Sequence, residues 1–245
     1  MILKNKTALV TGGSRGIGAA IVRRLAKDGA NVAFTYSQSA DVAEKLVKEI
    51  SAYGVKAKAY RADSAKPEQL PKLAEEVVKD FGSIDILVNN AGVFTLGAIG
   101  EISQEDYAKV MRVNVDAVFM LTNAAVKHMK AGARIINISS ILGERACDPN
   151  LSVYVGSKFA VSGLTRAWAK DLGPKGILVN AVMPGPIDTD MNPASGEYAD
   201  AQRVKVALGR YGKPEEIAGA VAFLAGPDAT FITGTTLTVD GGYNA

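Results

Sequence analysis

A tyrosine and a lysine stand four residues apart in the segment LSVYVGSKFAVSGLTRAW, residues 151–168. If this segment is helical, Tyr154 and Lys158 lie on one face, a single turn apart. A free phenol has a pKa of about 10, but a neighbouring ammonium favours the phenolate. Such a pair can donate a proton to a carbonyl oxygen or take one from an alcohol. Taken alone, the spacing is more often incidental, because any helix can carry it.

The residues around the pair favour a chemical role. They are small, as expected where a helix packs closely against another backbone or a cofactor; the small residues are Gly156, Ser157, Ala160, Ser162 and Gly163.

The elements that must position this helix alternate between strands and helices. Short runs rich in β-branched residues predict strands at 7–10, 31–36, 56–62, 84–89, 134–139, 177–183 and 236–239. Several of these runs are nearly continuous in apolar residues, as expected of strands covered on both faces. Amphipathic helical patterns, such as residues 16–29, separate them. This alternation predicts right-handed βαβ units and a parallel sheet. We therefore expect an α/β protein: a single doubly wound, Rossmann-type domain over residues 1–245, with a parallel seven-stranded sheet and helices on both faces.

One irregular segment interrupts the alternation. Residues 184–198, PGPIDTDMNPASGEY, are rich in Pro, Gly, Asp, Asn and Ser. An irregular segment of this length is either disordered or a functional lid. We expect a substrate lid around residues 186–208.

The first predicted strand runs directly into a glycine-rich turn, TGGSRGIG, at residues 11–18. Its glycines stand at 12, 16 and 18, which differs from the usual G-x-G-x-x-G spacing. Gly12 allows a tight turn, while Gly16 and Gly18 leave room for a pyrophosphate and for neighbouring backbone. The helix that follows offers free N–H groups to phosphates. We expect a dinucleotide on this turn, held by Gly12, Ser14, Arg15, Gly16, Ile17 and Gly18.

The end of the second predicted strand indicates which dinucleotide binds. NAD sites usually place an acidic side chain there, to hold the ribose 2′-OH. This strand ends in FTYSQS, which is neutral, and Asp41 comes too late. Arg15 can pair with a 2′-phosphate, and Ser37 can donate a hydroxyl to it. The sequence therefore favours NADP(H) over NAD(H).

Composition excludes several other classes of protein. The net charge of +3 is too small to indicate a nucleic-acid partner or an anionic membrane. With one cysteine, Cys147, and one histidine, His128, we expect no internal disulfide and no metal site. No apolar run is long enough to span a membrane, and no targeting leader is visible, so we expect a cytoplasmic protein.

Taken together, the motifs resemble the short-chain dehydrogenase/reductase family over essentially the full length. The branch of bacterial 3-oxoacyl-[acyl-carrier-protein] reductases is the most similar. The matching pieces are TGGSRGIG (11–18), Asp63, NNAG (89–92), Asn114, INISS (136–140), YVGSK (154–158), PGPIDTDM (184–191) and the closing TGTTLTVDGG (233–242).

The resemblance implies catalytic roles. Tyr154 would be the general acid in reduction and the base in oxidation, and Lys158 would lower its pKa and hold the nicotinamide ribose. Asn114 would anchor a water linking Lys158 to solvent; by itself it could equally cap a helix. The serine that binds the substrate oxygen is Ser139 or Ser140, which strand alternation points to opposite faces. The family pattern matches Ser140.

The resemblance also implies further cofactor contacts at the carboxyl ends of the strands. Asp63 would contact the adenine. The cleft and the nicotinamide amide would be lined by Asn90, Ala91, Gly92, Pro184, Gly185, Ile187 and Thr189, beside Tyr154 and Lys158.

The function that follows is an NADPH-dependent carbonyl reductase or alcohol dehydrogenase with a small-molecule substrate. The 3-oxoacyl thioesters, linked to acyl carrier protein, are the family-level expectation. Lys175 matches a basic docking position, although a solvated turn lysine explains it as well. The family implies a homotetramer, and the apolar helices at 115–126 and 161–172 could serve as an interface or as core. The alternative is a nucleotide-binding sensor without turnover, which need not keep Asn114, Ser140, Tyr154 and Lys158 together.

Overall fold

The computed structural model describes all residues from 1 to 245. Its strands are β1 (Thr7–Val10), β2 (Asn31–Tyr36), β3 (Ala57–Arg61), β4 (Ile86–Asn89), β5 (Arg134–Ile138), β6 (Leu178–Pro184) and β7 (Thr236–Val239). Its α-helices are α1 (Gly16–Lys27), α2 (Ala40–Ser51), α3 (Leu70–Phe81), α4 (Gln104–Met111), α5 (Ala117–Ala125), α6 (Ser152–Leu172), α7 (Glu197–Arg203) and α8 (Pro214–Ala225). Short helical turns are η1 (Pro67–Gln69), η2 (Arg112–Asp116), η3 (Ile141–Gly143), η4 (Gly173–Lys175) and η5 (Pro227–Ala229).

The strands form one seven-stranded sheet in the order β3-β2-β1-β4-β5-β6-β7. Every neighbouring pair is parallel. The predicted seven-stranded parallel sheet is confirmed. The strand order reverses direction between β1 and β4, and the crevice at such a switch point is where ligands bind in open α/β sheets.

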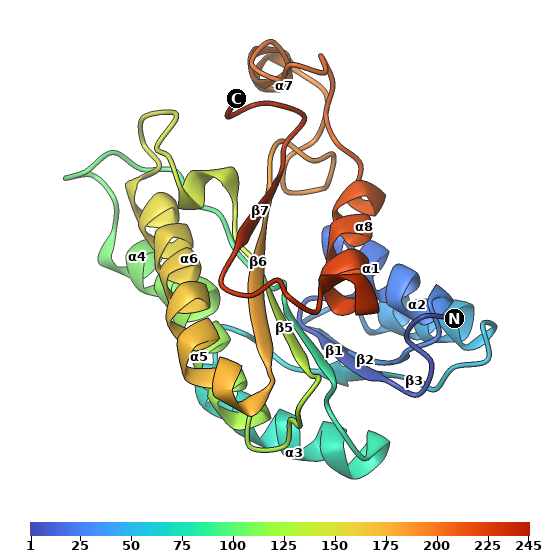
Figure 1. The fold of residues 1–245 in the computed structure, drawn as a ribbon. Helices are drawn as coiled ribbons and strands as arrows, with labels where there is room; N and C mark the ends of the chain where they lie inside the picture. The colour runs from blue at the N-terminus through green and yellow to red at the C-terminus, as the bar shows by residue number, and fades with distance from the viewer.

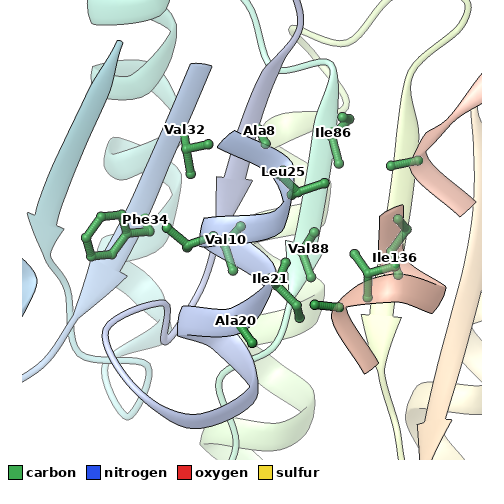
Figure 2. Close-up of a cluster of buried hydrophobic side chains, with 14 of the residues drawn as sticks. Ala8, Val10, Ala20, Ile21, Leu25, Val32, Phe34, Ile86, Val88 and Ile136 are labelled. Atoms are coloured by element: carbon green, nitrogen blue, oxygen red, sulfur yellow. The ribbon is translucent and has the colours of Figure 1, made fainter. Parts of the chain in front are cut away.

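Two helical layers cover the sheet, as Figure 1 shows: α1, α2 and α8 on one face, and α3, α5 and α6 on the other. Strand alternation divides the core between them. Val10, Phe34 and Val88 pack under α1 and α8 (Figure 2), whereas Leu9 and Leu87 face α3 and α5. All five side chains are buried.

The helices present one apolar stripe to the sheet, as their sequence periodicity predicts. In α1, Ile21 and Leu25 are fully buried while Arg23 and Lys27 are exposed. Burying each of these two aliphatic side chains stabilises the fold by about 1.5–3 kcal/mol. None of the helices combines the length and the apolar character that crossing a membrane requires.

The helix that carries Asn114 is not regular. The turn η2 between α4 and α5 is π-helical, and Asn114 lies at its centre, 1% exposed. Turns of this kind are rare and often occur at functional sites. The α4–η2–α5 unit packs against α6, which carries Tyr154 and Lys158.

Candidate active site

Tyr154 and Lys158 lie on one face of α6, as the four-residue spacing predicts. The Lys158 Nζ is 5.6 Å from the centroid of the Tyr154 ring. It donates a hydrogen bond of 3.0 Å to the carbonyl oxygen of Ile138, the last residue of β5. The lysine is 5% exposed and the tyrosine is half-buried. The pair therefore lies where β5 ends and α6 begins.

The structure distinguishes between the two adjacent serines. The Ser139 Oγ donates to the carbonyl oxygen of Lys158 at 3.1 Å and lies 3.1 Å from the Ser162 Oγ, so it joins β5 to α6. Ser140 points the other way, beside Tyr154, and its Oγ accepts a hydrogen bond from the Leu142 N–H at 3.1 Å. Ser140 is therefore the serine placed beside the phenol, as the motif predicts.

Asn114 does not cap a helix. Its Oδ1 accepts from the Val93 N–H at 2.9 Å, and its Nδ2 donates to the Val93 carbonyl at 3.0 Å and to the Ser157 Oγ at 3.1 Å. The Ser157 hydroxyl in turn donates to the main-chain carbonyl of Tyr154 at 2.7 Å. The side chain thus ties the loop after β4 to the first turns of α6.

Burial acts in opposite directions on the pKa values of the pair. It raises the pKa of Tyr154 to about 12, and the neighbouring Ser140 hydroxyl opposes this shift. It lowers the pKa of Lys158 to about 8. Desolvation is the largest effect on both groups, and the Lys158 ammonium donates to the Ile138 carbonyl. The lowering of the Tyr154 pKa by Lys158, which the resemblance implies, stays a prediction.

The glycine-rich turn has the shape that a diphosphate requires. Gly12 and Gly16 have φ angles of +62° and +53°, which glycine adopts readily. A Cβ on Gly18 would lie 2.2 Å from the Gly12 oxygen, so no side chain fits there. No side-chain cap satisfies the first N–H groups of α1, so they remain available to a phosphate at this end of the helix. The turn therefore fits a bound pyrophosphate.

Two polar residues to which the sequence reasoning assigned no hydrogen-bonding role hold this site together. The Thr11 Oγ1 accepts hydrogen bonds from the N–H groups of Asn90 and Ala91, at 2.9 and 3.0 Å. Ser157 is the other, bonded to Asn114 as described. The Asn90 Nδ2 donates to the Thr11 carbonyl at 2.8 Å, so this amide fixes the glycine turn to the loop after β4. The sequence feature that could have identified Thr11 is its hydroxyl group, directly after a mostly apolar strand.

The residues expected at the adenosine end lie at the carboxyl ends of β2 and β3. Arg15 and Ser37 are both exposed, and Ser37 directly follows β2. Asp63 follows β3 and is half-buried, and its Oδ1 accepts from the Ala65 N–H at 2.9 Å. Ser14 and Ile17 are half-buried in the glycine turn.

The segment after β6 borders the same edge of the sheet. Pro184 ends β6, and a Cβ on Gly185 would lie 2.7 Å from the Asp240 Cα. Ile187 is 5% exposed and packs in the core, so only its backbone is available to a cofactor. A Cβ on Gly16 would lie 3.5 Å from the Thr189 Cγ2, which places Thr189 against the glycine turn.

The expected lid is ordered by its own hydrogen bonds. The Gln202 Oε1 accepts from the Tyr211 hydroxyl at 2.5 Å and from the Asn192 Nδ2 at 3.0 Å. Helix α7 stands beyond the carboxyl ends of the strands in Figure 1.

Gly92, in the loop after β4, lies close to the catalytic lysine: a Cβ on Gly92 would lie 3.7 Å from the Lys158 Nζ. A separate hollow of about 580 Å³ between α4 and the start of α6 contains none of the catalytic candidates.

The doubly wound sheet, the glycine turn at its switch point and the polar cluster beside it define a nucleotide-dependent oxidoreductase. Residues 12–244 match the family model described as enoyl-(acyl carrier protein) reductase. The chain belongs to the short-chain dehydrogenase/reductase family.

Three relatives show the range of this family. The chain is 44% identical over 240 residues to the cyclic-di-GMP-binding biofilm dispersal mediator protein of Escherichia coli, covering 98% of both chains. It is 42% identical over 242 residues to a 3-oxoacyl-[acyl-carrier-protein] reductase of Staphylococcus epidermidis, covering 97% of this chain and 98% of the other. A short-chain dehydrogenase of Burkholderia cenocepacia, solved in complex with NADP, superimposes with a TM-score of 0.98 at 49% identity over 100% of both chains.

Proposed function

We propose that this protein is an NADPH-dependent carbonyl reductase, which runs in reverse as an alcohol dehydrogenase. Its catalytic residues are Asn114, Ser140, Tyr154 and Lys158. The observation that carries the proposal is the placement of Ser140 beside Tyr154, with Lys158 one turn further along α6 and the glycine turn at the same edge of the sheet.

The bound nicotinamide supplies the hydride, and the chain's residues manage the charge and the proton. Ser140 and Tyr154 hold the carbonyl oxygen as negative charge develops on it, which is usually the largest catalytic contribution. Tyr154 is protonated at neutral pH, since a phenol has a pKa of about 10 even without the rise that burial causes, and so it can donate the proton. Lys158 is charged below its pKa of about 8 and holds the ribose.

The proposed cofactor is NADP(H) rather than NAD(H). Arg15 and Ser37 are exposed at the adenosine end, and β2 carries no acidic side chain that would repel a phosphate there. An arginine beside a hydroxyl suits a 2′-phosphate. The NADP bound to the Burkholderia cenocepacia relative supports this choice.

The proposed substrates are 3-oxoacyl thioesters or related ketones, as the name of the Staphylococcus epidermidis relative suggests. Residues 186–208 would act as the lid over them. Lys175 is exposed and free to meet an acyl carrier protein. A homotetramer is proposed because Phe119 of α5 and Phe159 of α6 are each 45% exposed, on the helices expected to form an interface. Sedimentation velocity measures this assembly directly.

The experiment that tests the function follows the absorbance of reduced nicotinamide with an acetoacetyl thioester, comparing NADPH with NADH. We expect NADPH to be oxidised at least about tenfold faster, since a charged hydrogen bond contributes about 1.5–3 kcal/mol. Equal rates would contradict the cofactor assignment. If a panel of other ketones also leaves both cofactors unchanged, the reductase assignment is wrong.

A second candidate is a nucleotide-binding sensor without turnover. The specific observation in its favour is the 44% identity to a cyclic-di-GMP-binding protein. Calorimetry with cyclic-di-GMP, with and without NADPH, tests it. Binding of cyclic-di-GMP together with silence across the ketone panel would favour the sensor. The presence of all four catalytic residues favours the enzyme.

A further inference from the structure

Phe94 is the aromatic neighbour of the candidate general acid. It lies in the loop between β4 and α4 and is half-buried. Its ring centroid is 5.0 Å from that of Tyr154, and the two rings meet edge to face at 69°. Aromatic pairs prefer this geometry, because the positive edge of one ring meets the negative face of the other. The contact joins two segments that are 60 residues apart in the chain.

The backbone that carries Phe94 is fixed by Asn114. The preceding residue, Val93, is bonded to Asn114 through both its N–H and its carbonyl, at 2.9 and 3.0 Å. The same amide donates to the Ser157 Oγ at 3.1 Å, and Ser157 donates to the main-chain carbonyl of Tyr154 at 2.7 Å. Asn114 therefore holds both of the segments from which the two rings project.

The Tyr154 ring needs such a contact. The χ1 torsion sets where its hydroxyl oxygen lies, because that oxygen lies on the axis about which χ2 turns. Packing helps to select among the staggered χ1 positions. The hydroxyl has to stay beside Ser140, since proton transfer requires hydrogen-bond reach. The Lys158 ammonium donates its hydrogen bond to Ile138 and none to the phenol. Phe94 is the ring that packs against it.

We propose that Phe94 is a positioning residue: its edge-to-face contact keeps the Tyr154 hydroxyl beside Ser140, and Asn114 keeps Phe94 in place through Val93. This inference rests on the proposed function, because it assigns Phe94 a role through Tyr154. Phe94 itself transfers no proton.

The first part of the test compares two substitutions and one control. Phe94→Leu keeps apolar bulk and removes the ring, whereas Phe94→Tyr keeps the ring. Phe81→Leu, the control, removes another half-buried ring, which lies on α3 with the Lys56 Nζ 4.8 Å from its centroid. We expect Phe94→Leu to lower kcat for acetoacetyl thioester about tenfold, because small misplacements of reacting groups are costly. The KM for NADPH should change less than about twofold, and Phe94→Tyr should restore most of the rate.

The second part reads Tyr154 directly and needs no substrate. Fluorotyrosine is incorporated, and the ¹⁹F resonance of Tyr154 is assigned by its absence in Tyr154→Phe. In Phe94→Leu this resonance should shift or broaden and titrate at a lower pH, because water reaches the ring. Phe81→Leu should leave it unchanged.

The outcomes separate the inference from the proposed function. If the resonance and its titration are the same in Phe94→Leu as in the unmodified protein, the positioning role is wrong, whatever the kinetics. If the resonance moves while the unmodified protein reduces no ketone, the contact between the rings stands and the reductase assignment falls. A reduced kcat in Phe94→Tyr as large as in Phe94→Leu would also contradict the proposal.

Discussion

The Nζ of Lys158 donates a hydrogen bond of 3.0 Å to the carbonyl of Ile138, at the end of strand β5. This bond places an ammonium under the phenol of Tyr154 in a region with little access to water. The buried Lys158 ammonium therefore affects both the stability of the fold and the proposed proton transfer, and its protonation state can be tested.

Stability should depend on pH through Lys158. Burial lowers its pKa from the model-peptide value of 10.5 to about 8. Between these values the unfolded chain binds a proton that the native protein has released, so the free energy of unfolding rises with pH. We expect Lys158→Met to lose this part of the rise between pH 8 and 10, measured by urea unfolding. Lys175→Met, at an exposed lysine, is the control. Parallel curves for all three proteins would contradict the lowered pKa.

Removal of the Tyr154 hydroxyl should separate chemistry from binding. Tyr154→Phe deletes the proton donor but keeps the ring and its contact with Phe94. We expect turnover to fall by a factor of about 10² or more, with NADPH affinity nearly unchanged. Stopped-flow reduction and NADPH fluorescence titration give the two quantities. Tyr107→Phe, at a 50% exposed tyrosine on α4, should behave like the unmodified protein. Near-normal turnover in Tyr154→Phe would rule out the assigned general acid.

The glycine turn should not accept a methyl group at Gly18. An added Cβ would lie 2.2 Å from the Gly12 oxygen and 2.6 Å from the Asn90 Nδ2, and both belong to the tightly bonded turn. We expect Gly18→Ala to lower the free energy of unfolding by about 1–3 kcal/mol. NADPH affinity should fall with it. Gly173→Ala, where a Cβ meets nothing within 4 Å, is the matched control. Equal melting temperatures and NADPH affinities for the two variants would contradict this prediction, because they would show that the glycine turn shifts to accept the methyl group.

Cofactor preference should depend on Arg15 and Ser37. Arg15→Ala removes a cation from the expected 2′-phosphate site, and Ser37→Asp adds an anion to it. Each should weaken the binding of adenosine 2′,5′-bisphosphate by about tenfold or more and leave that of 5′-AMP nearly unchanged. Calorimetry measures both ligands without any turnover. Lys72→Ala, which removes an exposed charge on α3, is the control. A uniform loss of affinity for both ligands would point to damage to the turn instead.

Local patterns in the sequence determined the elements and most of the candidate site. Short β-branched and apolar runs located all seven strands, and several were nearly continuous because a strand buried on both faces has few polar positions. The i, i+4 spacing placed Tyr154 and Lys158 on one helix face, and the glycine spacing located the tight turn. These features depend on residues close together in the chain, so a sequence can specify them alone.

Only the tertiary structure decided how distant groups act on one another. It placed Ser139 against α6 and left Ser140 beside Tyr154, where strand alternation had shown only that the two differ. It directed Lys158 to the Ile138 carbonyl, and it buried the phenol of Tyr154, which raises its pKa. It also brought Phe94 against Tyr154. Desolvation and ring contacts depend on what surrounds a side chain in space, and neighbours 60 residues away in the chain leave no periodic signal in the sequence.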